Sequence, residues 1–118
     1  AALFGDAQRI AAECVGNKFI TQYGEILNES DSLKTSQGLC DLVVRPRGFH
    51  LTKNVDSPLK VIDLRYVGDG WLAFLSSDQV PVSAEPIRVE IDSPSELSIG
   101  DGVQLSAGGS GFFVFPKN

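Results

Sequence analysis

The chain has 118 residues, 42% of them hydrophobic and 21% charged, and this length and balance fit one globular domain. Lys and Arg number 10 and Asp and Glu number 15, so the net charge is −5. Nucleic-acid phosphates and anionic membrane surfaces are bound by clustered Lys and Arg. An acidic chain without a basic cluster therefore argues against both partners, and we expect a single domain over residues 1–118.

The first residues of the chain differ in pattern from the rest. The chain contains no methionine, and we interpret its start at Ala1 as processed or tagged. Apolar and small side chains recur at the spacing of one helix face, at Leu3, Ala7, Ile10, Ala11 and Cys14. This pattern predicts a short helix over residues 1–15, and a loosely ordered leader is the alternative.

From Lys18 onward the hydrophobic period changes to two, the period of half-buried strands. Gly-Asp-Gly triplets at 68–70 and 100–102 are strong turn signals, because Asp favours turns through its own side-chain hydrogen bonds. Strands are predicted at residues 18–23, 39–44, 47–52, 59–66, 71–75 and 87–92, from 103, and at 112–115, with a polar loop over 28–37. Short strands separated by turns predict an all-β fold, an antiparallel sandwich or barrel.

Two of these strands lead to specific predictions. In the segment 59–66, Ile62, Leu64 and Tyr66 are predicted to share one face. The stretch Phe112–Phe115 is more apolar than a strand with one solvated face requires, since such a strand buries only alternate residues. Either this strand is covered on both faces, or it lies beside something outside this chain.

The cysteines are Cys14 and Cys40. An even count in a small domain suits one disulfide in an oxidising compartment, and two buried thiols are the alternative. A bond between them would stabilise the fold by roughly 3 kcal/mol in the chain-entropy model. They do not form a redox C-x-x-C, and with one histidine they cannot form the usual four-ligand zinc site. We expect no metal site and no cofactor.

Little in the sequence indicates catalysis. His50 is the only histidine, and a general base needs a nucleophile and an orienting partner that no motif marks here. The chain has no G-x-S-x-G, P-loop or dinucleotide-binding pattern. The acidic clusters, Glu29 with Asp31 and Asp92 with Glu96, lack the ligand number and spacing of a calcium loop. We therefore predict a protein that binds another protein and is not an enzyme.

Several fragments, taken in order, are similar to a known family. They are Gly48-Phe49-His50-Leu51, Gly68-Asp69-Gly70-Trp71, the strand Ile87–Asp92, the segment from Ile99-Gly100 to Gly108-Gly109, and the apolar end before Pro116. Across residues 38–118 the chain resembles the invasin-type minor subunits at the tips of Afa/Dr fimbriae and aggregative adherence fimbriae. Residues 1–37 carry little of the resemblance. The family's cysteine in the last strand falls near Ser110 or Gly111 here, so the partner left for Cys40 is Cys14.

The resemblance implies an immunoglobulin-like, pilin-type sandwich that lacks one strand, which a donor strand supplies by β-augmentation. It implies export through the periplasm to the fimbrium at the cell surface. The implied partners are a periplasmic chaperone, an outer-membrane usher, the donor strand of a major fimbrial subunit and a host-cell receptor. The donor-strand groove is predicted at Leu42, Val44, Phe113 and Phe115, because each pair is spaced by two and can share a strand face.

Two further expectations concern the place of the subunit and its target. Helical spacing in residues 1–15 does not suit a donor strand, which favours a terminal subunit that accepts a strand and donates none. The resemblance suggests epithelial receptors, integrins among them, although the chain has no Arg-Gly-Asp triplet. The alternative function is a stand-alone extracytoplasmic binding module with a complete β-sandwich.

Overall fold

A computed structural model describes residues 7–29, 37–68, 70–93, 97–108 and 111–117. Within these ranges the chain is all-β, as predicted, with one short 3-10 turn and no α-helix, and thus no helix that could cross a membrane. The elements are β1 (Gln8–Val15), β2 (Lys18–Thr21), β3 (Gly24–Asn28), β4 (Gly38–Val44), η1 (Pro46–Gly48), β5 (Phe49–Lys53), β6 (Lys60–Tyr66), β7 (Trp71–Ser76), β8 (Ile87–Ile91), β9 (Val103–Ala107) and β10 (Phe112–Pro116).

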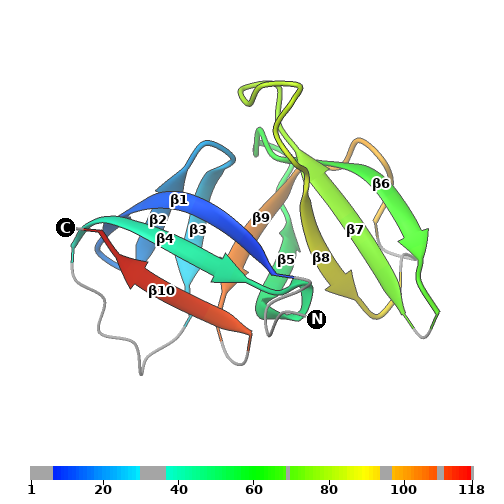
Figure 1. Cartoon of the computed structure of the whole chain (residues 1–118). Coiled ribbons are helices and arrows are strands. Elements are labelled where there is room, and N and C mark those ends of the chain that lie inside the picture. Colours follow the sequence, from blue (N-terminus) through cyan, green and yellow to red (C-terminus); the bar gives the residue numbers. More distant parts are fainter. Residues whose placement is uncertain (1–6, 30–36, 69, 94–96, 109–110, 118) are drawn as a thin grey trace.

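The strands form two sheets around one core (Figure 1). A curled seven-stranded sheet has the order β10-β4-β1-β2-β3-β9-β5, and a three-stranded sheet has the order β6-β7-β8. Every pair is antiparallel except β3 with β9. Large apolar side chains from both sheets fill the space between them, among them Phe19, Leu42, Leu75, Ile87 and Leu105. The two sheets therefore share one hydrophobic core.

The predicted helix over residues 1–15 is wrong for Gln8–Val15, which form strand β1; residues 1–6 lie outside the described ranges. Ile10, Ala12 and Cys14 point inward, and the residues between them are exposed. The adjacent alanines at 11 and 12 conceal this alternation in the sequence, because Ala suits either environment. Pairing with β2 on one side and β4 on the other overrides the local helical preference.

The remaining strands follow the predicted positions to within about two residues at their ends, the largest shift being that of the strand predicted from residue 47, which begins at Phe49 after η1. Two further differences are larger. The segment after Thr21 does not continue as one strand: it turns at residues 22–23 and returns as β3, which the sequence pattern did not indicate. In β6 the register shifts between Val61 and Asp63, so Ile62 occupies a bulge and is 46% exposed. A bulge reverses the alternation of faces beyond it. Leu64 and Tyr66 therefore do not share a face with Ile62, contrary to the prediction.

The second Gly-Asp-Gly turn forms as predicted. Gly100 has a φ of +100°, which favours glycine, and the Ser98 main-chain N–H donates to Asp101 Oδ2 at 2.9 Å. In the first triplet, the Val67 N–H donates to the Gly70 carbonyl at 2.9 Å and closes the β6–β7 hairpin. The side-chain role predicted for Asp69 lies outside the described residues.

Candidate functional site

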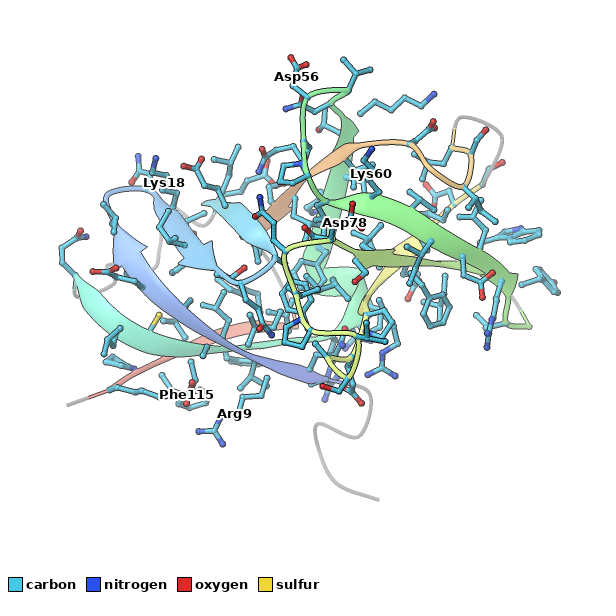
Figure 2. All side chains as sticks on the ribbon, turned by 90° about the horizontal axis from the view of Figure 1, so that it is seen from above. Arg9, Lys18, Asp56, Lys60, Asp78 and Phe115 are labelled. Atoms are coloured by element: carbon cyan, nitrogen blue, oxygen red, sulfur yellow. The ribbon has the colours of Figure 1, made fainter. Side chains whose placement is uncertain are left out.

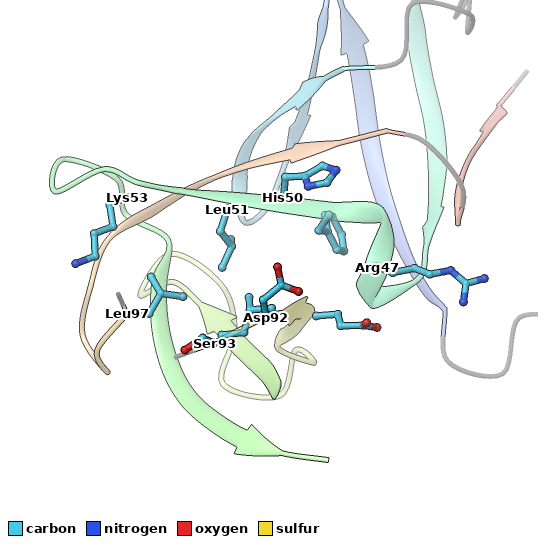
Figure 3. A pocket seen from close by; sticks show the side chains of 10 residues that line it. Arg47, His50, Leu51, Lys53, Asp92, Ser93 and Leu97 are labelled. Atoms are coloured by element: carbon cyan, nitrogen blue, oxygen red, sulfur yellow. The ribbon is translucent and has the colours of Figure 1, made fainter. Parts of the chain in front are cut away.

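A groove of about 660 Å³ lies between two strand edges (Figure 3). One wall is β5, the last strand of the seven-stranded sheet, and the other is β8, an outer strand of the three-stranded sheet. η1 contacts β8, so the two walls converge at that end. The lining residues are Arg47, Phe49, His50, Leu51, Lys53, Glu90, Ile91, Asp92, Ser93 and Leu97.

The β5 wall presents main-chain groups that have no hydrogen-bond partner among the described residues. The hydrogen bonds that flank the β5–β9 ladder join Gly48 to Gly108 and Asn54 to Gly102. Hydrogen-bonded positions alternate along an antiparallel pair, so the even-numbered residues of β5 bond to β9. Phe49, Leu51 and Lys53 therefore direct their N–H and C=O groups away from β9, and no hydrogen bond within the described residues uses them.

The β8 wall also directs main-chain groups toward the groove. Gln8 is buried, and its Nε2 donates to the Pro86 carbonyl at 2.7 Å while its Oε1 accepts from the Arg88 N–H at 2.8 Å. This side-chain amide bonds to one end of the β8 edge as a neighbouring strand would. It also shows that the even-numbered residues of β8 face away from β7. The Glu90 N–H and C=O point to the groove without a partner among the described residues.

The floor of the groove is apolar and incompletely covered. Phe49 is 2% exposed, whereas Leu51, Ile91 and Leu97 pack against the core but remain only partly buried. Figure 3 shows Leu51 pointing into the groove from β5. Side chains from an added strand would cover these residues, and each fully buried Leu or Ile gains roughly 1.5–3 kcal/mol over an exposed one. The groove thus offers both main-chain partners and apolar contacts.

Charged side chains stand at the rim. Arg47 and Lys53 lie at opposite ends of the β5 wall, and Lys53 Nζ is 3.5 Å from Asp101 Oδ2. Glu90 and Asp92 give the β8 wall its negative charge. Among the described residues no group of three or more His, Cys, Asp and Glu side chains is arranged to hold a metal ion.

His50 lines this groove together with Asp92 and Ser93, the residue types of a hydrolase triad. In Figure 3, however, the His50 ring lies on the opposite side of the β5 ribbon from Leu51. Within the described part of the chain, no hydrogen bond or ion pair joins His50 to Asp92 or Ser93. This geometry does not supply the nucleophile–base contact that nucleophilic catalysis uses.

The residues predicted for the donor-strand groove do not come together on one face. Leu42 and Val44 are 0% exposed and belong to the core. In the β4–β10 register they lie opposite Val114 and Phe112, whereas Phe113 and Phe115 lie opposite Val43 and Asp41. Successive side chains of a strand point to opposite faces, so the two phenylalanines are on the outer face, 41% and 48% exposed. The described residues do not cover both faces of this strand, so among them the first of the two alternatives, a strand buried on both faces, does not hold.

Cys14 and Cys40 lie on neighbouring strands and both point into the core, where each is 2% exposed. They are free thiols in this structure. Burial raises the pKa of the Cys40 thiol, and the neighbouring Cys14 raises that pKa further. The disulfide between them stays a prediction, and the burial of both thiols agrees with either alternative.

The sequence pattern does not reveal the β5–β8 groove, because the two walls come from different sheets. Each of its apolar residues has the ordinary signature of a half-buried strand, and only the pairing of the sheets identifies β5 and β8 as outer strands. One available signal was the pair of fragments 48–51 and 87–92, which already stood out in the resemblance and form the two walls. No family model matches this chain, and no curated protein sequence matches it.

Proposed function

We propose that this chain is a strand-accepting minor or tip subunit of a bacterial chaperone-usher fimbria, acting in adhesion to or invasion of host cells. The observation that supports this function best is the β5–β8 groove, with outward-facing main-chain groups on Leu51 and Glu90 and a partly uncovered apolar floor. An extended segment between the two walls would hydrogen-bond to both and join the two sheets. This is β-augmentation, in which main-chain bonds supply affinity and side-chain pockets supply register.

The groove also indicates the chemistry of the segment that fills it. Alternate side chains of an inserted strand would point to Leu51, Ile91 and Leu97 and must be apolar. The intervening side chains would point outward between the basic β5 wall and the acidic β8 wall and are polar. In the proposed function a periplasmic chaperone occupies the groove first, and the N-terminal extension of a major subunit replaces it at the outer-membrane usher.

Thermal unfolding with a synthetic donor peptide tests the proposal. The peptide should be the N-terminal extension of the major subunit of the same fimbria, with apolar residues at alternating positions. At about 100 times its Kd, a ligand that binds only the folded state adds about 2.7 kcal/mol, which raises the Tm of a small domain by roughly 10 °C. A stable monomer whose Tm the peptide leaves unchanged would instead be a stand-alone module with a complete sandwich.

A matched pair of variants locates the binding site. Glu90→Pro removes the N–H that faces the groove and leaves the bonds to β7, because Glu90 faces away from β7 and Pro is tolerated at such edge positions. Glu90→Ala removes the same charge and keeps the N–H. The peptide should stabilise the Ala variant like the parent protein and the Pro variant much less. Equal stabilisation of both variants would show that the peptide binds elsewhere on the protein and not in this groove.

The adhesin role needs its own measurement. The strand-complemented protein should bind cultured epithelial cells in a saturable way, and the unlabelled complex should compete for the same sites. If it does not bind, the adhesive role is excluded, whereas the peptide experiment would still test a structural role at the fimbrial tip.

A further inference from the structure

β10 is the other outer strand of the seven-stranded sheet, and it carries two exposed phenylalanine side chains outside the groove. Phe112 is 4% exposed and Val114 packs against the core. Phe113 and Phe115 lie on the outer face, beside the partly buried Val43 of β4. Figure 2 shows Phe115 and Arg9 projecting from the same side of the sheet. The strand therefore combines an open edge with an apolar outer face.

The main-chain pattern of β10 shows which groups this edge offers. The Arg45 N–H donates to the Gly111 carbonyl and the Lys117 N–H donates to the Leu39 carbonyl, so the odd-numbered residues bond to β4. Phe112 and Val114 therefore direct their N–H and C=O groups away from β4, and no hydrogen bond within the described residues uses these groups. Pro116, next in this series, has no N–H to offer.

We propose that two copies of this chain pair antiparallel through β10, about a two-fold axis that passes beside Phe113. In this register Phe112 lies opposite the partner's Val114, and Val114 lies opposite the partner's Phe112. Each of these two pairings exchanges both main-chain hydrogen bonds. The outward-facing groups of the strand are thus used by an identical strand, as a closed two-fold interface requires.

The position of Pro116 selects this register over its neighbour. An axis at Val114 would place Pro116 opposite the partner's Phe112. Each such pair would lose one of its two main-chain hydrogen bonds, because proline has no N–H to donate. With the axis at Phe113, Pro116 lies beyond the paired residues. Proline and lysine are residues with which natural proteins limit edge pairing, and here they follow directly at positions 116 and 117. They would confine the contact to a short, closed dimer.

The side chains agree with a second copy as the occupant. The two Phe113 rings, each 41% exposed in one copy, would meet across the axis at a non-hydrogen-bonded position, where opposite side chains come closest. β10 itself carries no charged residue, so the two strands do not repel each other. The paired surface is small, and interfaces of this class are weak and transient. We expect a monomer–dimer equilibrium that depends on protein concentration.

Sedimentation equilibrium over a wide concentration range tests the dimer, with two lysine variants as a matched pair. Phe113→Lys places like charges directly opposite each other and should raise the dimer Kd more than tenfold. Phe115→Lys makes the same change at an exposed aromatic residue two positions from the axis and should raise the Kd much less. A mixture of Phe113→Lys with Phe113→Glu should restore a heterodimer. Each variant is first checked for an unchanged fold by circular dichroism.

Cross-linking gives a second readout that does not depend on affinity. Phe113→Cys should form an intermolecular disulfide under mild oxidation, because Cα atoms at a non-hydrogen-bonded pair lie about 4.5 Å apart, within the range of disulfides. Phe115→Cys should not. A protein that stays monomeric at all concentrations, equal effects of the two lysine variants, or a dimer dissolved by the donor peptide would each overturn the proposal. The last result would assign the β10 edge to the donor strand.

Discussion

Asp41 lies on the outer face of β4 between two cationic side chains. Its Oδ2 accepts from Arg9 Nη2 at 2.7 Å and Nε at 3.1 Å, and its Oδ1 is 3.3 Å from Lys117 Nζ. The Asp41 side chain is 9% exposed, whereas that of Arg9 is 73% exposed. The hydrogen bond from Arg9, followed by that from Lys117, holds the pKa of this carboxyl below its ordinary value. A single carboxylate therefore links β1 and the residue after β10 across β4.

This arrangement predicts how stability depends on pH. Because the pKa of Asp41 is lower in the folded chain, its stabilising effect is complete above the ordinary carboxyl value and is lost as the pH falls through the folded pKa. Asp41→Asn should lower Tm at pH 7, and the difference from the parent protein should shrink as the solution is acidified below pH 4. Asp56→Asn is the control, since exposed Asp56 forms no ion pair among the described residues. A constant Tm difference across this acid range would contradict the assignment.

At the scale of elements, the turn before β9 depends on a close main-chain approach. A Cβ at Gly102 would lie 2.4 Å from the carbonyl oxygen of Asn54, and the Asn54 N–H donates to the Gly102 carbonyl at 2.9 Å. Lys60, at the start of β6, also pairs with Gly102. This glycine therefore brings the end of β5 and the start of β6 together.

Replacing Gly102 tests that approach. Gly102→Ala should destabilise the fold by roughly 1–3 kcal/mol, the usual cost of an overpacked site, as measured by urea unfolding. Gly70→Ala is matched to it, because a Cβ at Gly70 meets nothing within 4 Å, and its effect should stay within about 0.5 kcal/mol. Equal unfolding free energies for the two variants would mean that the main chain relaxes around the added methyl group.

The elements that could be predicted from the sequence are those whose alternation is local. β8 has a clean period of two, and the sequence predicts it nearly to its ends, whereas the sequence favours a helix for β1 because Ala11 and Ala12 carry no signal of burial. The bulge at Ile62 and the outward directions of Leu51 and Glu90 depend on the register between strands. The apolar excess of β10 is a local property and is recognisable in the sequence. Register is a long-range property, so the β5–β8 groove is not.

At the scale of the whole molecule, the two strand edges proposed as binding surfaces, the β5–β8 groove and the β10 edge, lie at different places in the fold. The β5–β8 groove lies where the seven-stranded sheet meets the three-stranded sheet, and Gln8 already bonds across that junction. A strand in the groove would add main-chain bonds between the sheets to the contacts of the shared core. The β10 edge lies at the far end of the seven-stranded order, and pairing there would extend one sheet into a second copy.

Amide hydrogen exchange separates these two events. In the free protein at low concentration, the outward-facing amides of Leu51, Glu90 and Val114 should exchange fast, whereas those of His50 and Thr52, which bond to β9, should be protected. Donor peptide should protect Leu51 and Glu90 and leave Val114 fast. Raising the protein concentration without peptide should protect Val114 alone of these three. Peptide that protected Val114 and left Leu51 unchanged would show that the strand adds to β10, because an amide slows only where its N–H gains a partner.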